Sequence, residues 1–284
     1  MKVEAYLQLV RPLNSAMMGV AVLIGEYMAL GGTLNLQASL LGFLTAFTLT
    51  GGSMAANDYF DREVDRVNEP ERPIPSGRVT PREALWLAGI LGAVGLFLSF
   101  LSWLFFRGFL APLVASASFT LAIYYNGWGK RLGLLGNLMV SGCVAIPFLY
   151  GAFMVGVYPS LLLAFFAALA FLANTGREIL KGIADVEGDK LRGVKTLAIT
   201  WGAWKAALAA SAFYLAAVIL SLIPPFLGAV SPWYIPPVAL ACAGFLYVSF
   251  RILWKPGRVE ARKLKKLSLF WMLSGMVGFL LGVP

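Results

Sequence analysis

Residues 84–106 read ALWLAGILGAVGLFLSFLSWLFF, a stretch of 23 residues without a charge. A helix of about 20 apolar residues crosses the hydrocarbon core of a bilayer, so this stretch predicts a membrane-spanning helix. The whole chain has the same character, because 59% of its 284 residues are hydrophobic, only 13% are charged, and the mean hydropathy is +0.78. These values lie outside the range of soluble domains and predict a multi-pass protein of the cell membrane, in contact with membrane lipids.

Eight further segments are long and apolar enough to span in the same way. With residues 84–106 they make nine: Leu13–Gly31, Ala38–Asn57, Ala84–Phe106, Phe109–Tyr125, Leu132–Phe153, Pro159–Leu180, Ala203–Ile223, Pro232–Leu253 and Leu267–Val283. We therefore expect an all-α fold with nine transmembrane helices, in a single integral membrane domain over residues 1–284.

Orientation follows from the basic residues, because short cytoplasmic loops carry an excess of Lys and Arg. Of the 23 basic residues, 22 fall on the side of the amino terminus and only Arg107 falls on the other. This pattern predicts a cytoplasmic amino terminus and, with nine spans, a carboxyl terminus outside. The acidic residues share the cytoplasmic side, since 11 of the 14 lie in the connections 58–83 and 178–189. Topology alone does not require that clustering.

The residue types that the chain lacks narrow its chemistry. There is no histidine, which excludes His-ligated zinc and catalysis by Ser-His or Cys-His pairs. Cys143 and Cys242 both fall inside apolar segments, so they predict neither a disulfide framework nor a Cys metal site. The net charge is +9, but no basic face interleaved with aromatic residues occurs, and we expect no nucleic-acid partner.

The first acidic cluster reads NDYFDREVD over residues 57–65, at the cytoplasmic end of the second predicted span. Residues three and four apart share a helix face, so Asp58, Asp61 and Asp65 form one stripe if the helix continues. Such a stripe favours a cation, and Mg²⁺ typically takes one or two carboxylates and fills its other positions with water and phosphate oxygens. The cluster predicts a site for magnesium and a diphosphate.

The second cluster reads REILKGIADVEGD over residues 177–189, at the end of the sixth predicted span. On a helix, four side chains fall within an arc of roughly 80°: Glu178, Lys181, Asp185 and Asp189. The spacing of the two aspartates repeats that of Asp61 and Asp65, so residues 57–65 and 181–189 read as pseudo-repeated motifs. Two facing pairs would each hold a magnesium ion with one diphosphate between them. A helix break at Gly188 would loosen this geometry.

Each cluster also has a plainer interpretation as a salt-bridged loop. In the first cluster the partners would be Arg62, Arg66 and Arg72. The helical spacing disfavours this interpretation there, because it groups the carboxylates and points the arginines elsewhere. For the second cluster taken alone, the sequence favours a metal site over a salt-bridged loop less clearly.

With both motifs in view, the sequence resembles the UbiA superfamily of intramembrane prenyltransferases. Its first motif, Asn-Asp-x-x-Asp-x-x-x-Asp, is matched by Asn57, Asp58, Asp61 and Asp65, followed by RPIPSG at 72–77. Its second motif is matched in part by Asp185 and Asp189. Tyr125, Lys130 and Arg131 resemble the segment after the family's fourth helix, and RPLN at 11–14 resembles the start of its first helix.

Within the superfamily, the closest likeness is to the archaeal digeranylgeranylglyceryl phosphate synthases. It rests on REI at 177–179, DVEGD at 185–189 and GVKTL at 193–197. One position departs from the pattern, because a further aspartate is expected three residues before Asp185 and Gly182 stands there. This departure bears on how a second magnesium ion is completed, and Glu178 is a candidate substitute.

The resemblance implies helices around a central cavity with Asp-rich cytoplasmic loops. It implies transfer of a geranylgeranyl group from geranylgeranyl diphosphate to geranylgeranylglyceryl phosphate, with two Mg²⁺ ions, to form the second ether bond of archaeal membrane lipids. Catalytic and metal-binding roles then fall to Asp58, Asp61, Asp65, Asp185 and Asp189. Substrate-binding roles fall to Asn14, Asn57, Arg72, Tyr125, Lys130, Arg177 and Lys181. Topology signalling by the basic residues, and helix capping by Asn14, are the plainer alternatives.

Other functions remain open at this level. An aromatic acceptor, as in quinone biosynthesis, is the main alternative, and the residues alone do not separate the two acceptors. A membrane ion transporter is more remote, because its carboxylates are expected near mid-membrane or along a pore rather than at helix ends.

Overall fold

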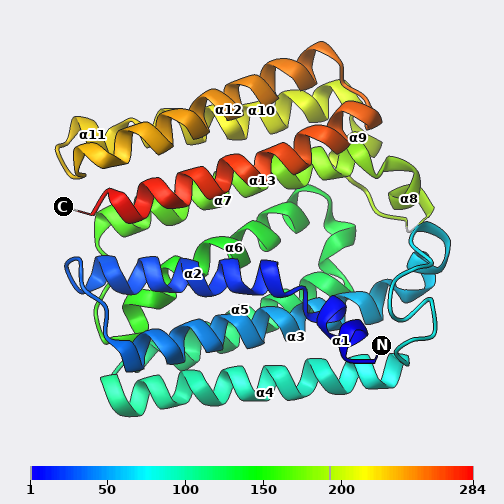
Figure 1. Ribbon diagram of the computed structural model, residues 1–284. Helices are drawn as coiled ribbons and strands as arrows, with labels where there is room; N and C mark the ends of the chain where they lie inside the picture. The colour runs from blue at the N-terminus through cyan, green and yellow to red at the C-terminus, as the bar shows by residue number, and fades with distance from the viewer. Residues whose placement is uncertain (1, 192, 284) are drawn as a thin grey trace. The chain divides into compact units, whose positions relative to one another are not determined.

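The computed structural model describes residues 2–191 and 193–283; Arg192, which the charge count includes, lies outside them. The described residues form helices and no strand, which confirms the all-α class (Figure 1). The helices are α1 (Lys2–Val10), α2 (Pro12–Ala29), α3 (Leu36–Asn68), α4 (Pro81–Phe106), α5 (Leu110–Gly127), η1 (Gly129–Leu132), α6 (Leu134–Met154), α7 (Leu161–Ala184), α8 (Val186–Leu191), α9 (Leu197–Thr200), α10 (Ala203–Ser221), α11 (Ile223–Phe226), η2 (Pro232–Tyr234), α12 (Ile235–Trp254) and α13 (Arg258–Leu281).

Seven segments of the described chain are long and apolar enough to cross a membrane: Leu36–Arg66, Pro81–Phe106, Leu134–Met154, Leu161–Ala184, Ala203–Phe226, Pro232–Trp254 and Arg258–Leu281. The helices α1 and α2 pass as an eighth when the pair, bent by 44°, is taken as one span. The remaining predicted span, 109–125, forms α5, which is not among these segments. A polytopic membrane protein is confirmed, whereas the number nine is not.

The chain forms two compact units. One contains Met1–Gly129 and Ile146–Pro159, and the other contains Lys130–Ala145 and Ser160–Pro284. The boundary crosses α6 next to Pro147, which removes a backbone hydrogen bond from the helix interior. In the first unit α3 packs against α1, α2, α4 and α5. In the second, α7 and α12 each pack against both α10 and α13 (Figure 1). The single-domain interpretation stays a prediction.

Helix α3 is held at its amino-terminal end by polar contacts. The Asn35 side chain accepts hydrogen bonds from the backbone N–H groups of Gln37 and Ala38, both at 3.1 Å. The fully buried Glu26 of α2 accepts hydrogen bonds from the Asn35 N–H at 3.0 Å and from Ser39 Oγ at 2.8 Å. These contacts fix where α3 begins and give a buried carboxylate its partners.

Helix α3 is longer than a membrane crossing requires. At about 1.5 Å per residue, 33 residues extend about 50 Å, beyond a hydrocarbon core of about 30 Å. The helix ends at Asn68, and Glu69 precedes Pro70, a position that disfavours helical backbone. The aspartates of the first motif therefore lie on a regular helix at its polar end.

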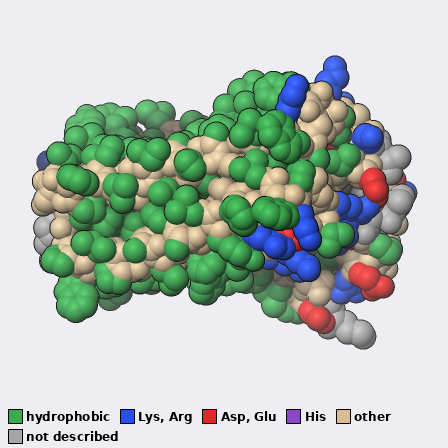
Figure 2. All heavy atoms as spheres, turned by 90° about the horizontal axis from the view of Figure 1, so that it is seen from above, with side chains coloured by type: hydrophobic (Ala, Val, Ile, Leu, Met, Phe, Trp, Pro, Cys, Tyr) green, Lys and Arg blue, Asp and Glu red, His purple; other side chains and the backbone are tan. Residues whose placement is uncertain are grey.

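Apolar side chains face outward along the helices. Trp86 of α4 is 73% exposed and Phe226 of α11 is 90% exposed, as expected for groups in contact with lipid. Figure 2 shows a face on which hydrophobic side chains follow the helices while Lys, Arg, Asp and Glu side chains gather at one end. On this face the charged side chains are thus separated from the hydrophobic ones, as they are along the sequence.

Candidate active site

The first motif lies on one continuous helix, which meets the condition for a single acidic stripe. Helix α3 runs through Asn57, Asp58, Asp61 and Asp65. Asp58 and Asp65 are buried, at 4% and 2% exposure, whereas Asp61 is half-buried. The Asn57 amide donates to Asp61 Oδ2 at 3.1 Å and to Asp58 Oδ1 at 3.4 Å, and so spans the stripe.

Two arginines point into this stripe, contrary to the expectation that the arginines lie elsewhere. Arg72 donates to Asp65 Oδ2 at 2.8 Å and lies 3.7 Å from Asp58 Oδ1. Arg11 donates to the same Asp58 oxygen at 2.7 Å. Buried carboxylates need compensating charge, and these guanidinium groups supply it. Burial alone would lower the pKa of Arg72, but Asp65, Glu69 and Asp58 outweigh it and raise that pKa above its usual range.

The other two arginines of the cluster behave as the helical spacing predicted. Arg66 binds Glu63 at 2.7 Å, and Arg62 lies 3.4 Å from the same glutamate. The Arg62 guanidinium also stacks over the Tyr59 ring, at 4.5 Å from its centroid. Both side chains therefore leave the face that carries Asp58, Asp61 and Asp65.

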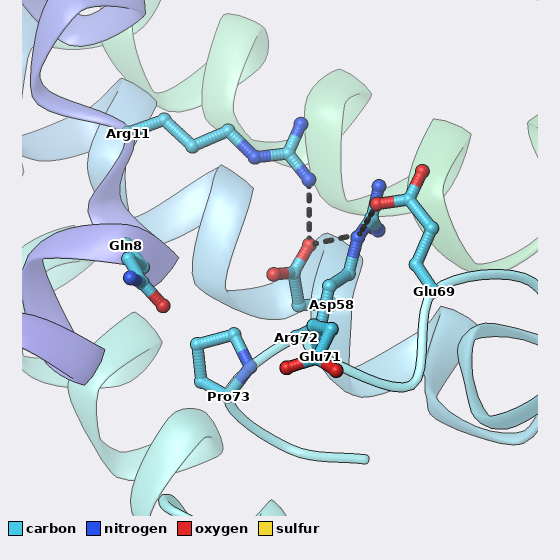
Figure 3. Close-up of a pocket in the computed structure, with 7 residues that line it drawn as sticks. All are labelled: Gln8, Arg11, Asp58, Glu69, Glu71, Arg72 and Pro73. Carbon is cyan, nitrogen blue, oxygen red and sulfur yellow. Dashed lines mark hydrogen bonds and ion pairs between the residues drawn. The ribbon is translucent and has the colours of Figure 1, made fainter. Parts of the chain in front are cut away.

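A pocket of about 330 Å³ opens where these charges meet (Figure 3). Its lining residues are Gln8, Arg11, Asp58, Glu69, Glu71, Arg72 and Pro73. In the close-up, Arg11 approaches Asp58 from the α1–α2 junction, and Arg72 approaches it from the loop after α3. The pocket thus presents two guanidinium groups beside a buried carboxylate, an arrangement suited to an anion with an attendant cation.

The backbone at Arg11 is unusual. Its φ of 49° and ψ of 69° place it in the left-handed region, where glycine is favoured and other residues carry a cost of roughly 1–2 kcal/mol. Pro12 follows and begins α2, so this residue forms the corner between α1 and α2. Asn14 does not cap this helix, because the capping position is Arg11 and Asn14 lies half-buried in the first turn.

The second motif is broken at a different residue from the one expected. Helix α7 ends at Ala184 with Asp185 as its cap, and Gly188 and Asp189 lie inside the short helix α8. The break comes three residues before Gly188, so Glu178, Lys181, Asp185 and Asp189 do not share one continuous helix. The Asp189 N–H still donates to the Asp185 carbonyl at 2.9 Å, which keeps the two residues adjacent.

The carboxylates of the second motif are paired with cations of the same unit. Glu178 is 7% exposed and accepts from Arg177 at 3.0 Å and from Lys181 at 3.2 Å. Asp185 accepts from Lys265 of α13 at 3.2 Å. A Cβ added at Gly182 would lie 3.4 Å from Thr196 Cβ, an ordinary contact, so the space beside this glycine is bounded by Thr196.

The remaining predicted residues fall in separate places. Tyr125 is half-buried on α5, in the unit of the first motif. Lys130 is half-buried in η1, in the unit of the second motif. The two motifs belong to different compact units, so facing metal sites stay a prediction.

The donor chemistry suits magnesium, although the present arrangement pairs the carboxylates with basic side chains. Within residues 2–191 and 193–283, no three or more His, Cys, Asp or Glu side chains are grouped to hold a metal ion. The oxygens of Asp58, Asp61, Asp65 and Asn57 are the hard donors that Mg²⁺ prefers. Arg11 and Arg72 now neutralise two of those carboxylates, so a metal ion would share or replace these ion pairs.

Two site residues were missed from the sequence. Arg11 lies 47 positions from Asp58, and Lys265 lies 80 positions from Asp185, so local spacing does not connect either pair. The sequence does not single out Lys265, because Lys266 lies equally close to the apolar Leu264 and Leu267. For Arg11 the only signal was its place before Pro12 at the start of a span.

Comparisons with known proteins identify the family of this chain. Residues 18–274 match the UbiA prenyltransferase family. The digeranylgeranylglyceryl phosphate synthase of Methanopyrus kandleri is 40% identical over 277 residues, which cover 98% of each chain. A solved structure of a digeranylgeranylglyceryl phosphate synthase has a TM-score of 0.78 at 29% identity and covers 99% of this chain and 98% of its own.

A more distant structure, a UbiA homologue from Archaeoglobus fulgidus bound to GPP and Mg²⁺, shares the fold. Its TM-score is 0.68 at 19% identity, over 97% of this chain and 99% of its own. The family match spans well over half of the chain, and the apolar helices agree with it. This chain belongs to the UbiA prenyltransferase family and is an integral membrane prenyltransferase.

Proposed function

We propose that this protein transfers a geranylgeranyl group from geranylgeranyl diphosphate to geranylgeranylglyceryl phosphate in a Mg²⁺-dependent reaction. The support for the acceptor is the likeness, over nearly the full length, to the Methanopyrus kandleri enzyme and to the solved synthase. The support for the diphosphate is the charge arrangement in the pocket, where Arg11 and Arg72 meet at the buried Asp58. That convergence is the single observation on which the proposal rests most heavily.

The reaction requires an anionic leaving group to depart. The allylic C–O bond breaks with its electron pair on the diphosphate, the acceptor hydroxyl oxygen forms the new C–O bond, and the departing diphosphate takes the hydroxyl proton. Bound Mg²⁺ supplies charge neutralisation of the diphosphate. We propose Asp58, Asp61 and Asp65, and in the second motif Asp185 and Asp189, as the residues that hold it.

The basic and amide side chains have a separate task in this proposal. Arg72 and Arg11 bind diphosphate oxygens, and Lys130, Lys181 and Arg177 add positive charge on the other motif. Asn57 orients Asp61 through its 3.1 Å hydrogen bond, and Asn14 and Tyr125 contact the substrate. Glu178 is better suited to orienting Arg177 and Lys181 than to binding metal, because both cations already engage it.

An acceptor assay tests the proposal. Purified protein is incubated with Mg²⁺, geranylgeranyl diphosphate and either geranylgeranylglyceryl phosphate or an aromatic acid, and products are identified by mass spectrometry. We expect the doubly prenylated glyceryl phosphate, and its loss when EDTA removes the metal. Prenylation of the aromatic acid alone would replace the acceptor, and ion flux without any product would refute the proposed reaction.

Two aspartate variants test the motifs themselves. Asp61→Ala and Asp185→Ala should each lower turnover by at least about a hundredfold, as removal of a preorganised electrostatic group typically does. Their elution on gel filtration should match that of the wild type. Near-normal turnover in either variant would remove that residue from the proposed metal site.

A further inference from the structure

Lys265 occupies an unexpected position on the carboxyl-terminal helix. Ala261, Leu264 and Ser268 of α13 are buried, at 0%, 2% and 0% exposure, and their spacing of three and four marks the packed face of the helix. Lys265 lies beside this face and its side chain is only 23% exposed. The neighbouring cations of the same helix are exposed: Arg262, Lys263 and Lys266. A lysine at this position is costly unless a specific partner compensates it.

The partner is Asp185 of the second motif. Lys265 Nζ lies 3.2 Å from Asp185 Oδ2 and 3.5 Å from Oδ1, so both carboxylate oxygens face the ammonium group. The two residues come from α13 and from the end of α7, which pack against each other (Figure 1).

Three cations converge on this motif. Arg177 and Lys181 bind Glu178, and Lys265 binds Asp185. Gly182 stands where the second motif of the superfamily that this sequence resembles has a further aspartate. By that resemblance, this motif carries one negative charge fewer. A site with fewer carboxylates and an added ammonium group favours an anion more and a bare cation less.

We infer that Lys265 is a diphosphate-binding residue that holds Asp185 in the free protein and binds a diphosphate oxygen when metal and substrate arrive. A lysine suits this exchange, because its ammonium group has three donors on a flexible stem and acts as a point charge. Its positive charge then stabilises the leaving diphosphate. The inference rests on the proposed function. It adds Lys265 of α13 to the residues of the second motif that are proposed to bind the diphosphate.

Binding measurements on the full-length protein in detergent test this role. The variants are Lys265→Met and Lys265→Gln, and the matched control is Lys266→Met, which removes an equal charge from the adjacent exposed position. Isothermal titration with inorganic diphosphate at saturating Mg²⁺ reports the anion, and the EPR signal of free Mn²⁺ reports the metal. Lys265→Gln keeps a hydrogen-bond donor for Asp185, which guards against a variant that fails to fold.

We expect both Lys265 variants to bind inorganic diphosphate about tenfold more weakly or worse, the effect of losing a charged hydrogen bond. Their Mn²⁺ affinity should be unchanged or higher, because Asp185 has lost a competing cation. Lys266→Met should change neither affinity by more than about twofold. Lys265→Arg should restore most of the diphosphate affinity.

Two results would overturn the inference. Diphosphate affinity in the Lys265 variants equal to that of Lys266→Met would show that the lysine does not bind the anion. A loss of both affinities together would show that it only holds the end of α7 in place. If the wild-type protein with Mg²⁺ binds no diphosphate, the proposed function fails as well, so the two failures are distinguishable.

Discussion

Arg72 contacts three carboxylates at the first motif. It binds Asp65 and Glu69, both at 2.8 Å, and approaches Asp58 at 3.7 Å. The planar guanidinium serves several acceptors at once, which a lysine cannot do from one position. Arg72→Lys should therefore lower kcat/KM for geranylgeranyl diphosphate by about tenfold or more.

The matched control for Arg72→Lys is Arg66→Lys. Arg66 is exposed and binds the exposed Glu63, so its replacement should change kcat/KM by less than about twofold. The measurement is the steady-state rate of the two variants and of the wild type at varied concentrations of the prenyl diphosphate. Equal rates in all three would leave Arg72 with a structural role only.

At the same scale, the aspartates and one of their partners, Arg72, were named from the sequence, whereas Arg11 and Lys265 were not. Asp58, Asp61 and Asp65 follow from spacing along one helix, which the sequence contains in full. Arg11 and Lys265 reach their carboxylates through the packing of helices distant in sequence, which spacing cannot reveal. The corner at Arg11 shows the same limit, because its left-handed backbone depends on how α1 and α2 meet.

At the scale of elements, the continuity of α3 beyond the membrane holds the first motif together. Glu63 is exposed, lies between Asp61 and Asp65, and binds only Arg62 and Arg66 among the described residues. Glu63→Pro removes a helix hydrogen bond and clashes with the preceding turn, at a cost of about 3 kcal/mol. It should abolish most prenyl transfer, because a helix broken at residue 63 no longer holds the carboxylates of Asp61 and Asp65 on one face.

Glu63→Ala provides the comparison, since it removes the same side chain and keeps the helix. It should retain activity and stay within about 0.5 kcal/mol of the wild type in unfolding free energy. Product formation and thermal unfolding in detergent are the two measurements. Substantial activity in Glu63→Pro would mean that the motif does not need a continuous helix.

Hydropathy located the helices but not their polar ends. The predicted span 84–106 begins in the structure at Pro81, because Thr80 and Glu83 cap each other's backbone N–H groups at 3.2 and 2.7 Å. The predicted span 38–57 continues to Asn68, since a polar helix outside the membrane leaves no hydropathy signal. The same limit applies to α5, whose polar last turn lowers its apolar content.

At the scale of the whole molecule, the charge distribution decides whether α5 crosses the membrane. Helix α4 ends beside Arg107, the one basic residue predicted to lie outside, and α6 begins after Lys130 and Arg131. If α5 did not cross, every helix from α6 onward would be inverted, and the basic connections at 177–205 and 251–266 would face outside. The positive-inside rule opposes that arrangement strongly. We therefore propose that α5 spans, that the active-site loops are cytoplasmic and that the carboxyl terminus is outside.

Cysteine labelling in intact cells tests this topology. In a background where Cys143 and Cys242 are replaced by serine, Arg107→Cys should react with a membrane-impermeant maleimide from outside. Arg131→Cys should react only after the membrane is permeabilised, because about 20 residues of α5 separate the two positions across the bilayer. A third variant, Val283→Cys, should label from outside like Arg107→Cys. Labelling of positions 107 and 131 from the same side would mean that α5 returns without crossing, and the orientation of all later helices would have to be reversed.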